Sequence, residues 1–281
     1  MLHKLTGLCT GLCPAVLGLA VLGMTGTRTA TAQGGGPPKI LLIDVEYLKP
    51  TTSMGAHQKA ESAFVNAAKQ ANLQERWTAM NSLTGQPRAL FIFGYDSLAE
   101  FEKTHLEPMS HPEMAASMDS MMSEDGALLS NSEGALYKYR EDLSHKPNVD
   151  IAKMRYMEIT RVALRPGHGP EWESYLKMLQ SALDKFSPDR HIAVFQSMYG
   201  RDNGGVWLLF IPLKSLDEAD QIAADRDGLA KKMGDADANK FRELVAASID
   251  HSQRNLFAYD PAMSYPPDSW VKEDPAFWGK K

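Results

Sequence analysis

The feature that most constrains the fold is an internal repeat. Four segments in the first half of the chain recur in the same order in the second half, and matched segments lie 115 to 120 residues apart. The pairs are "VEYLKP" (45–50) with "RVALRP" (161–166), "NSLTG" (81–85) with "QSMYG" (196–200), "ALFIFGYDSLAEFE" (89–102) with "WLLFIPLKSLDEAD" (207–220), and "SEGALYKYRED" (132–142) with "SQRNLFAYDPA" (252–262). A constant order with small shifts indicates a duplicated unit with short loop insertions.

Each copy opens with a β-rich run, residues 40–48 and 154–164, which is followed by Lys49-Pro50 or Arg165-Pro166. Proline cannot donate a hydrogen bond to a sheet and restrains the residue before it, so each pair ends its strand. Apolar residues at helical spacing come next and predict a helix in each copy. They are Ala60, Ala63, Phe64, Ala67 and Ala71 in the first copy, and Trp172, Tyr175, Leu176, Leu179, Leu183 and Phe186 in the second.

Two paired strands follow the helix in each copy. They cover residues 76–83 and 88–94 around "TGQP", and residues 191–199 and 206–211 around "GRDNGG". The glycines and Asn203 in these connections suit hairpin turns that need positive φ.

A second helical region follows the hairpin, over residues 98–131 and 216–250, and Ser97 and Ser215 are suited to cap it. A short strand closes each copy, at 135–140 and 255–259. The predicted order is therefore β-α-β-β-α-β, twice.

This order is that of the ferredoxin-like unit, an antiparallel sheet with both helices on one face. A single unit would expose the other, apolar face of its sheet, whereas two units can bury it sheet against sheet. We therefore predict an α+β fold of two tandem ferredoxin-like repeats packed as an intramolecular barrel. The predicted domains are residues 39–146 and 153–261, followed by an arm of prolines and aromatics, 262–281, that docks on the barrel or on a neighbour.

The repeated order and the segment "LRPGHGPEWESYL" (164–176) resemble the dimeric α/β-barrel superfamily, in particular its NIPSNAP-like and antibiotic-biosynthesis-monooxygenase-like branches. The resemblance covers residues 40–260. It implies a barrel with a space between two sheets and suggests a monooxygenase-like activity, which in these branches can be cofactor-free. One fold hosts unrelated functions, so the resemblance alone does not choose among them.

The N-terminus is typical of an export signal. Lys4 precedes an apolar run over residues 5–24, and Ala30-Thr31-Ala32 forms an A-x-A cleavage site before Gln33. We expect residues 1–32 to be removed and the product to be periplasmic or extracellular. Both cysteines, Cys9 and Cys13, would leave with this segment, so no disulfide or cysteine ligand is expected in the mature chain.

Composition and motifs exclude several classes of function. The net charge is −5 and no basic stripe is present, which disfavours nucleic-acid binding. Beyond the signal no apolar run is long enough to span a membrane. The chain contains no HExxH, G-x-S-x-G, P-loop or strand-linked GxGxxG motif, so hydrolase, zincin and nucleotide-binding functions have no motif to support them.

The space between the two sheets is the natural pocket of such a barrel. We expect the more polar face of the first strands to line it, which nominates Asp44, Glu46 and Glu158. A buried carboxylate needs a partner or a raised pKa, so Asp44 and Glu158 are candidate acids or bases and Glu46 a candidate ligand contact. The alternative is that all three lie near strand ends and meet water.

Other polar and aromatic residues of the strands are further candidates. His191 can act as a base or a haem ligand, although its place at the start of a strand favours an exposed edge position. The predicted ligand contacts, besides Glu46, are Trp77, Asn81, Arg161, Gln196 and Trp207. Asn81 and Gln196 occupy matching positions beside the hairpins and can bind a ligand or satisfy the backbone.

A methionine-rich stretch, residues 105–122, raises the question of copper, because thioether sulfur suits Cu(I). Its Met114, Met118 and Met121 recur at helical spacing, which is typical of an ordinary apolar helix face. We therefore predict core packing here and no metal site.

Three functions stay open from the sequence. The first is an exported barrel that binds a small, partly apolar molecule between its sheets. The second is a monooxygenase-like enzyme, cofactor-free or haem-dependent, with Asp44, Glu158 or His191 as its base. The third is a protein-interaction scaffold. Fusion of the two halves permits a monomer, and a homo-oligomer is equally compatible with the sequence.

Overall fold

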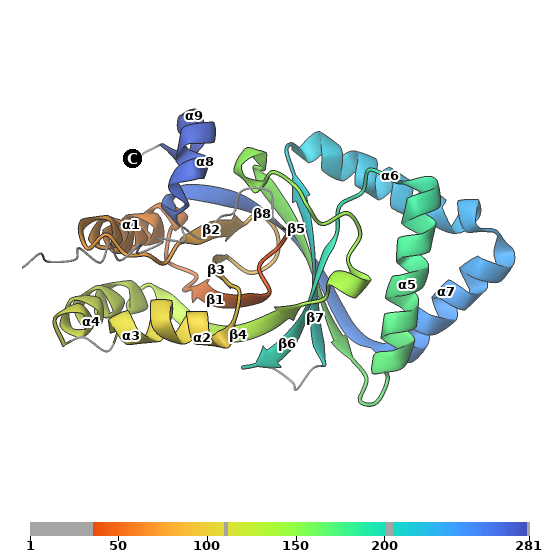
Figure 1. The fold of residues 1–281 in the computed structure, drawn as a ribbon, viewed down its shortest axis with the longest axis horizontal. Helices are drawn as coiled ribbons and strands as arrows, with labels where there is room; N and C mark the ends of the chain where they lie inside the picture. The colour runs from red at the N-terminus through yellow and green to blue at the C-terminus, as the bar shows by residue number, and fades with distance from the viewer. Residues whose placement is uncertain (1–35, 110–111, 201–204, 280–281) are drawn as a thin grey trace, which may run out of the picture. The chain divides into compact units, whose positions relative to one another are not determined.

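A computed structural model describes residues 36–109, 112–200 and 205–279. The predicted signal segment lies outside these residues, as does Asn203 of the second hairpin. The described residues form eight strands (Figure 1). They are β1 (Ile40–Leu48), β2 (Trp77–Ser82), β3 (Arg88–Tyr95), β4 (Leu129–Tyr139), β5 (Tyr156–Leu164), β6 (Ala193–Tyr199), β7 (Val206–Leu213) and β8 (Ile249–Tyr265).

The strands close into one antiparallel barrel in the order β1-β3-β2-β8-β5-β7-β6-β4. The first half of the chain supplies the arc β4-β1-β3-β2 and the second half the arc β8-β5-β7-β6, joined at the β2–β8 and β4–β6 pairings. The prediction of an α+β fold built around a barrel is confirmed. Closure means that neither arc keeps a free edge.

Two strands extend further than expected. β4 and β8 begin six residues before their predicted starts, at Leu129 and Ile249. Their first residues are polar and largely exposed, yet they pair in register with β1 and β5. Apolar alternation therefore located only the parts of these strands that lie over the core.

Helices flank the barrel, α1 to α4 on the side of the first half and α5 to α7 on the side of the second (Figure 1). Their bounds are α1 (Met54–Gln70), α2 (Leu98–Phe101), the π-helical turn η1 (Glu102–Leu106), α3 (Glu107–Met109), α4 (Pro112–Gly126), α5 (Gly169–Phe186), α6 (Leu216–Met233) and α7 (Asp235–Ser248). Two short 3-10 turns, η2 (Glu141–Leu143) and η3 (Ile151–Lys153), lie between the halves.

Local capping explains where several helices begin. The Ser53 hydroxyl accepts a hydrogen bond from the Ala56 backbone N–H at 3.1 Å, and Ser97 does the same for Glu100 at 3.1 Å, as predicted for Ser97. Ser215 occupies the N-cap position of α6 without a side-chain cap bond. The hairpin glycines Gly85 and Gly200 have φ values of +78° and +84°, which favour glycine.

The buried side of α1 differs from the predicted apolar stripe. His57, Glu61, Val65 and Ala68 are its buried residues, whereas Ala63 is exposed. The four positions keep helical spacing but include two ionisable side chains. A polar layer therefore lies between α1 and the sheet.

The main core fills the barrel interior with one face of every strand. Its buried members from β1 and β5 are Leu41, Ile43, Met157 and Ile159. A second core lies outside the barrel, where α5 packs Trp172, Leu176 and Leu183 against the opposite face of β6 and β7. The two cores use alternate residues of the same strands.

The segment after β8 forms two short helices, α8 (Asp268–Glu273) and α9 (Pro275–Trp278). Trp278 is 4% exposed and packs into the barrel core, and its indole N–H donates to the Ala152 carbonyl at 2.8 Å. Tyr259 contacts the Trp278 ring at 5.7 Å between centroids. The aromatic arm thus docks on its own barrel, at the end where β1 and β5 begin.

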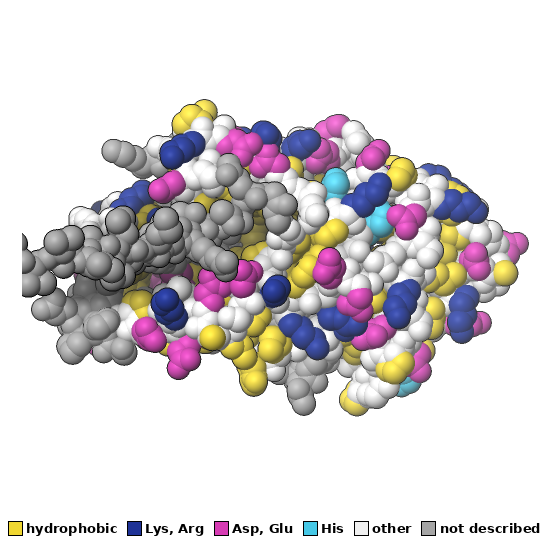
Figure 2. All heavy atoms as spheres, viewed as in Figure 1, with side chains coloured by type: hydrophobic (Ala, Val, Ile, Leu, Met, Phe, Trp, Pro, Cys, Tyr) yellow, Lys and Arg dark blue, Asp and Glu magenta, His cyan; other side chains and the backbone are white. Residues whose placement is uncertain are grey.

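The outer surface carries interspersed charges of both signs on the face shown in Figure 2. No helix within the described ranges is long and apolar enough to cross a membrane.

Candidate functional site

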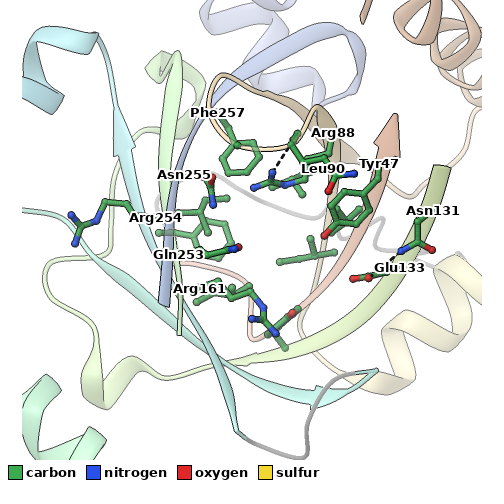
Figure 3. A pocket seen from close by; sticks show the side chains of 18 residues that line it. Tyr47, Arg88, Leu90, Asn131, Glu133, Arg161, Gln253, Arg254, Asn255 and Phe257 are labelled. Atoms are coloured by element: carbon green, nitrogen blue, oxygen red, sulfur yellow. Dashed lines mark hydrogen bonds between the residues drawn. The ribbon is translucent and has the colours of Figure 1, made fainter. Parts of the chain in front are cut away.

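The barrel contains a chamber of about 660 Å³ at the end where β1 and β5 finish, opposite Trp278 (Figure 3). A volume of this size is typical of small-molecule sites. Its apolar wall consists of Ile43, Val45, Leu90, Ile159, Leu208, Phe210 and Phe257. Its polar lining, mostly nearer the strand ends, consists of Tyr47, Gln86, Arg88, Asn131, Glu133, Tyr137, Arg161, Gln253, Arg254 and Asn255.

Two arginines bring positive charge to the chamber, Arg88 from β3 and Arg161 from β5 (Figure 3). The Arg88 guanidinium lies 5.0 Å from the centre of the Phe257 ring and donates to the Gln86 carbonyl at 2.9 Å. Burial lowers the pKa of Arg88. Within the described ranges neither arginine has a carboxylate at ion-pair distance, so both keep their charge available for a ligand.

A third arginine of the lining, Arg254, is directed away from the chamber (Figure 3). Its Nε lies 3.3 Å from Glu158 Oε1 on the outer side of the sheet. The charge of Arg254 is therefore paired with Glu158 and is not directed at the chamber.

The Tyr137 hydroxyl of the chamber lining is a poor base. Burial raises the pKa of Tyr137 to about 12, so its phenol keeps its proton at neutral pH. Glu133, the carboxylate of the lining, is half-buried and accepts a hydrogen bond from Asn131 at 3.2 Å.

The prediction that the more polar strand face lines the central space was wrong. Ile43, Val45 and Tyr47 of β1 face the chamber, so Asp44 and Glu46 lie on the outer face under the helices. Glu158 likewise lies outside, where Arg226 donates to it at 2.8 Å. The reason is that the barrel interior is filled by an apolar core, and the charged face finds its partners in the helix layer.

The predicted ligand contacts are divided between the two sides of the sheet. Arg161 lies in the chamber wall, and its role as a ligand contact stays a prediction. Trp207 packs on Trp172 in the outer core, and Trp77 packs on Phe93 and Tyr265.

The two amides at the hairpins also lie outside the chamber. Asn81 donates to Asp260 at 2.8 Å, and Gln196 accepts from Arg140 at 3.2 Å. Both satisfy neighbouring side chains rather than line the cavity, so neither is a contact for a chamber ligand.

The described lining of the chamber offers a haem only a tyrosine, Tyr47 or Tyr137, as an axial ligand. The lining contains no histidine, cysteine or methionine in the part of the chain that the structure describes. His191 lies ahead of β6, half-exposed, and its Nδ1 donates to the Lys146 carbonyl at 2.6 Å. The proposed axial ligand is therefore outside the chamber.

Two clusters of ionisable residues lie in the helix layer of the first half. In one, His105 contacts Glu75 at 3.0 Å and Glu75 accepts from the Tyr95 hydroxyl. Burial raises the pKa of the nearby Asp44 to about 6, and the negative charges of Glu46 and Glu75 add to this effect, while His105 opposes it. The positive charge of His105 therefore offsets part of the negative charge of the carboxylates in this cluster.

The second cluster consists of Glu46, His57, Glu61 and Asp125, whose ligand atoms all lie within 4.8 Å of one another. No sequence pattern combines these residues, because they are scattered over 80 positions and a histidine and a glutamate take the place of apolar residues on α1. The i, i+4 spacing of His57 and Glu61 was the available signal.

The methionine-rich stretch falls mainly on α4, where Met118 and Met121 are half-buried and Met122 is 61% exposed. The side chain of Met114 lies outside the described residues. Neither Met118 nor Met121 belongs to a hydrophobic core of the described residues, so core packing by this stretch stays a prediction.

Comparison with known proteins places the fold. The sequence matches no protein-family model and no curated protein. An anthrone oxidase-like protein superposes with a TM-score of 0.53 at 11% identity, covering 79% of this chain and 91% of the other. A protein from Fusobacterium nucleatum, described as a candidate monooxygenase, gives a TM-score of 0.51 at 10% identity over 79% and 93%.

A chlorite dismutase from Candidatus Nitrospira defluvii gives a TM-score of 0.47 at 9% identity, covering 80% of this chain and 92% of the other. At these identities the likeness to the anthrone oxidase-like protein and to the Fusobacterium nucleatum protein shows a shared fold alone, and the function must be argued from the site.

Proposed function

We propose that the barrel binds one small amphipathic anion in the chamber, with its apolar part against the inner wall and its acidic group between Arg88 and Arg161. The observation that carries the proposal is a pair of half-buried arginines, without carboxylate partners among the described residues, beside an apolar cavity of about 660 Å³. A partly buried charge without a counter-ion carries a desolvation cost, so a bound carboxylate, sulfonate or phosphate would relieve that cost.

The apolar wall favours a ring or a short chain as the rest of the molecule. Phe210 and Phe257 offer aromatic faces, and Ile43, Leu90 and Ile159 complete the surface. Tyr47, Gln253 and Asn255 supply hydrogen-bonding groups on the lining. A few polar groups around an apolar cavity are the usual means of orienting such a ligand.

The test uses a fluorescent pair of matched shape. The probe 8-anilinonaphthalene-1-sulfonate carries an anion, and N-phenyl-1-naphthylamine lacks it. We expect Arg88→Met and Arg161→Met each to weaken binding of the sulfonate about tenfold, the size of one charge-assisted hydrogen bond, and to leave the neutral probe unchanged. Val45→Trp, which adds bulk to the apolar wall of the chamber, should weaken binding of both.

Arg242→Met, an exposed arginine on α7, is the control variant. Equal sulfonate binding by the arginine variants and the control would overturn the proposal. Native mass spectrometry of the purified protein then identifies a co-purified molecule, and its mass should disappear in Val45→Trp.

A second candidate is cofactor-free oxygenation of an anionic aromatic substrate in the same chamber. The fold shared with a candidate monooxygenase and an anthrone oxidase-like protein supports it, and two arginines can stabilise an electron-rich phenolate. Oxygen consumption with hydroxyaromatic substrates tests it, and a rate that is identical in Val45→Trp would exclude the chamber as the site.

We further propose that the chain is a tandem pair of ferredoxin-like units and that residues 1–32 direct its export. The matching arcs β4-β1-β3-β2 and β8-β5-β7-β6 support the duplication, and the apolar run with its A-x-A site supports export. N-terminal sequencing of the protein from the secreting cell should begin at Gln33.

A further inference from the structure

We infer that Glu46, His57, Glu61 and Asp125 form a binding site for one divalent transition-metal ion, of the Mn²⁺ or Zn²⁺ kind, between β1, α1 and α4. The inference is independent of the chamber ligand, because the site lies on the outer face of β1. Tyr47, the neighbour of Glu46 in the strand, faces the chamber on the other side.

The fold brings the four donors together from three elements. Glu46 projects from the outer face of β1, His57 and Glu61 stand one turn apart on the buried side of α1, and Asp125 lies in the last turn of α4. His57 is 0% exposed, and Glu61 and Asp125 have exposed fractions of 6% and 3%. Only Glu46, with a side chain 20% exposed, leads to solvent.

The geometry converges on the imidazole. His57 Nε2 lies 2.8 Å from Glu46 Oε2, 3.4 Å from Asp125 Oδ1 and 4.0 Å from Glu61 Oε1. Donors at bonds of about 2.0 Å around a tetrahedral ion stand roughly 3.3 Å apart. The observed separations bracket that value, so small side-chain rotations would bring all four atoms to an ion.

The environment of Asp125 is a second observation that supports a bound metal ion. Asp125 Oδ1 is buried, directed at His57, and without a hydrogen-bond partner among the described residues. A buried carboxylate oxygen of this kind is rarely left without a partner. A metal ion would satisfy it.

The charge of the cluster leads to the same conclusion. Within the described ranges no lysine or arginine pairs with the three carboxylates, and His57 is their shared neighbour. Three carboxyl groups this close cannot all be ionised without strong repulsion unless a cation lies between them, and a divalent ion would offset most of that charge.

The donor chemistry selects the class of ion. One imidazole nitrogen with three carboxylate oxygens suits Mn²⁺, Fe²⁺ or Zn²⁺, whereas Ca²⁺ prefers six to eight oxygens and Mg²⁺ keeps several waters. None of the four donors is a sulfur atom, which disfavours Cu(I). The occupied site would hold α1 and α4 on the sheet.

The test uses the full chain after treatment with EDTA and dialysis. We expect isothermal titration with Zn²⁺ and with Mn²⁺ to show one ion per chain, and elemental analysis after desalting to confirm the same stoichiometry. Bound ion should also raise the melting temperature, because it binds the folded state alone. No binding of either ion by the EDTA-treated chain would overturn the inference.

Variants locate the site. His57→Gln and Asp125→Asn should each weaken binding at least tenfold, the lower end of what even an outer-shell change causes. Glu46→Gln, at the solvent-facing edge, keeps the test valid if a buried variant does not fold. His145→Gln is the matched control, since His145 is a buried histidine beside a carboxylate in another region. Unchanged affinity in Glu46→Gln and in every folded buried variant would place the ion elsewhere and refute the site.

Discussion

The helix layers of the two halves solve the same packing problem with opposite chemistry. The helix after β1 buries His57, Glu61, Val65 and Ala68, while the helix after β5 buries Trp172, Leu176, Ala182 and Leu183. The second layer is therefore an ordinary apolar core. The first carries buried charge, which a protein keeps at a cost to stability unless that charge is paired or used.

The partners of the carboxylates on the outer faces of β1 and β5 show the same contrast. Glu158, on the outer face of β5, has two arginine partners, Arg226 at 2.8 Å and Arg254 at 3.3 Å. Glu46 on β1 has His57 and two further carboxylates around it. The carboxylate on the outer face of the second half thus has cationic partners. The carboxylates around Glu46 in the first half have the composition of a cation-binding site.

The largest expected effect tests the apolar layer. Trp172 is 1% exposed and stacks on Tyr175 with ring centroids 5.0 Å apart. Trp172→Ala should lower the free energy of unfolding by about 3–5 kcal/mol, because it leaves a cavity among large side chains. Urea denaturation measures this loss, with the exposed Lys177→Ala as the control. A loss below about 1 kcal/mol would show that α5 is not an apolar anchor.

The paired carboxylate of the second half should give the next largest effect. Glu158→Gln removes the negative partner of Arg226 and Arg254, which are 33% and 48% exposed, so water offsets part of the loss. We expect about 1–2 kcal/mol of destabilisation at neutral pH, decreasing with added salt. An effect that does not respond to salt would contradict an electrostatic origin.

A pH-dependent effect is expected at His105. Burial alone would lower the pKa of His105, but its hydrogen bond to Glu75 and the charge of that group raise it overall. Since the folded pKa exceeds the unfolded value, near 6.5, the stabilisation is fully present below pH 6.5 and is lost as the pH rises through the folded value. His105→Gln should therefore cost about 1 kcal/mol at pH 5.5 and less at pH 9, as followed by urea denaturation. A cost that grows with pH would contradict the ion pair.

The smallest effect on stability is expected at Glu61, and it best distinguishes the polar helix layer of the first half from the apolar helix layer of the second half. In the metal-free protein Glu61 carries its proton at pH 7, because its pKa is raised to about 9 by burial and by Glu46 and Asp125. Glu61→Gln should then change stability by less than about 1 kcal/mol. With Zn²⁺ present the same substitution should cancel most of the metal-induced rise in melting temperature. A large loss in metal-free protein would indicate a closed hydrogen-bond network instead of a metal site.

Sequence patterns predicted the strands well and the roles of their faces poorly. Pro50 and Pro166 mark where the first strands end, and the glycines of the turns located the hairpins, because these signals act on the local backbone. Which face of β1 lies inside depends on how eight strands close, a long-range property. Polarity was misleading here because Glu46 contacts His57 on α1, a helix that the pattern treats as apolar.

The candidate sites were predictable in different degrees. Arg161 was identified as a ligand contact and lies in the chamber, while Arg88 and Tyr47 were missed although Tyr47 shares the face of Ile43 and Val45. His57 and Asp125 meet only because α1 and α4 lie side by side over β1. No local pattern in the sequence encodes that contact.

The two inter-half pairings, β2–β8 and β4–β6, have a consequence for aggregation. If the halves were separated, each would present two strands with unsatisfied peptide groups, β2 and β4 in one and β6 and β8 in the other. Such rows recruit further strands and promote polymerisation. Covalent fusion keeps the complementary rows at high local concentration, so that ring closure outcompetes the growth of intermolecular sheets.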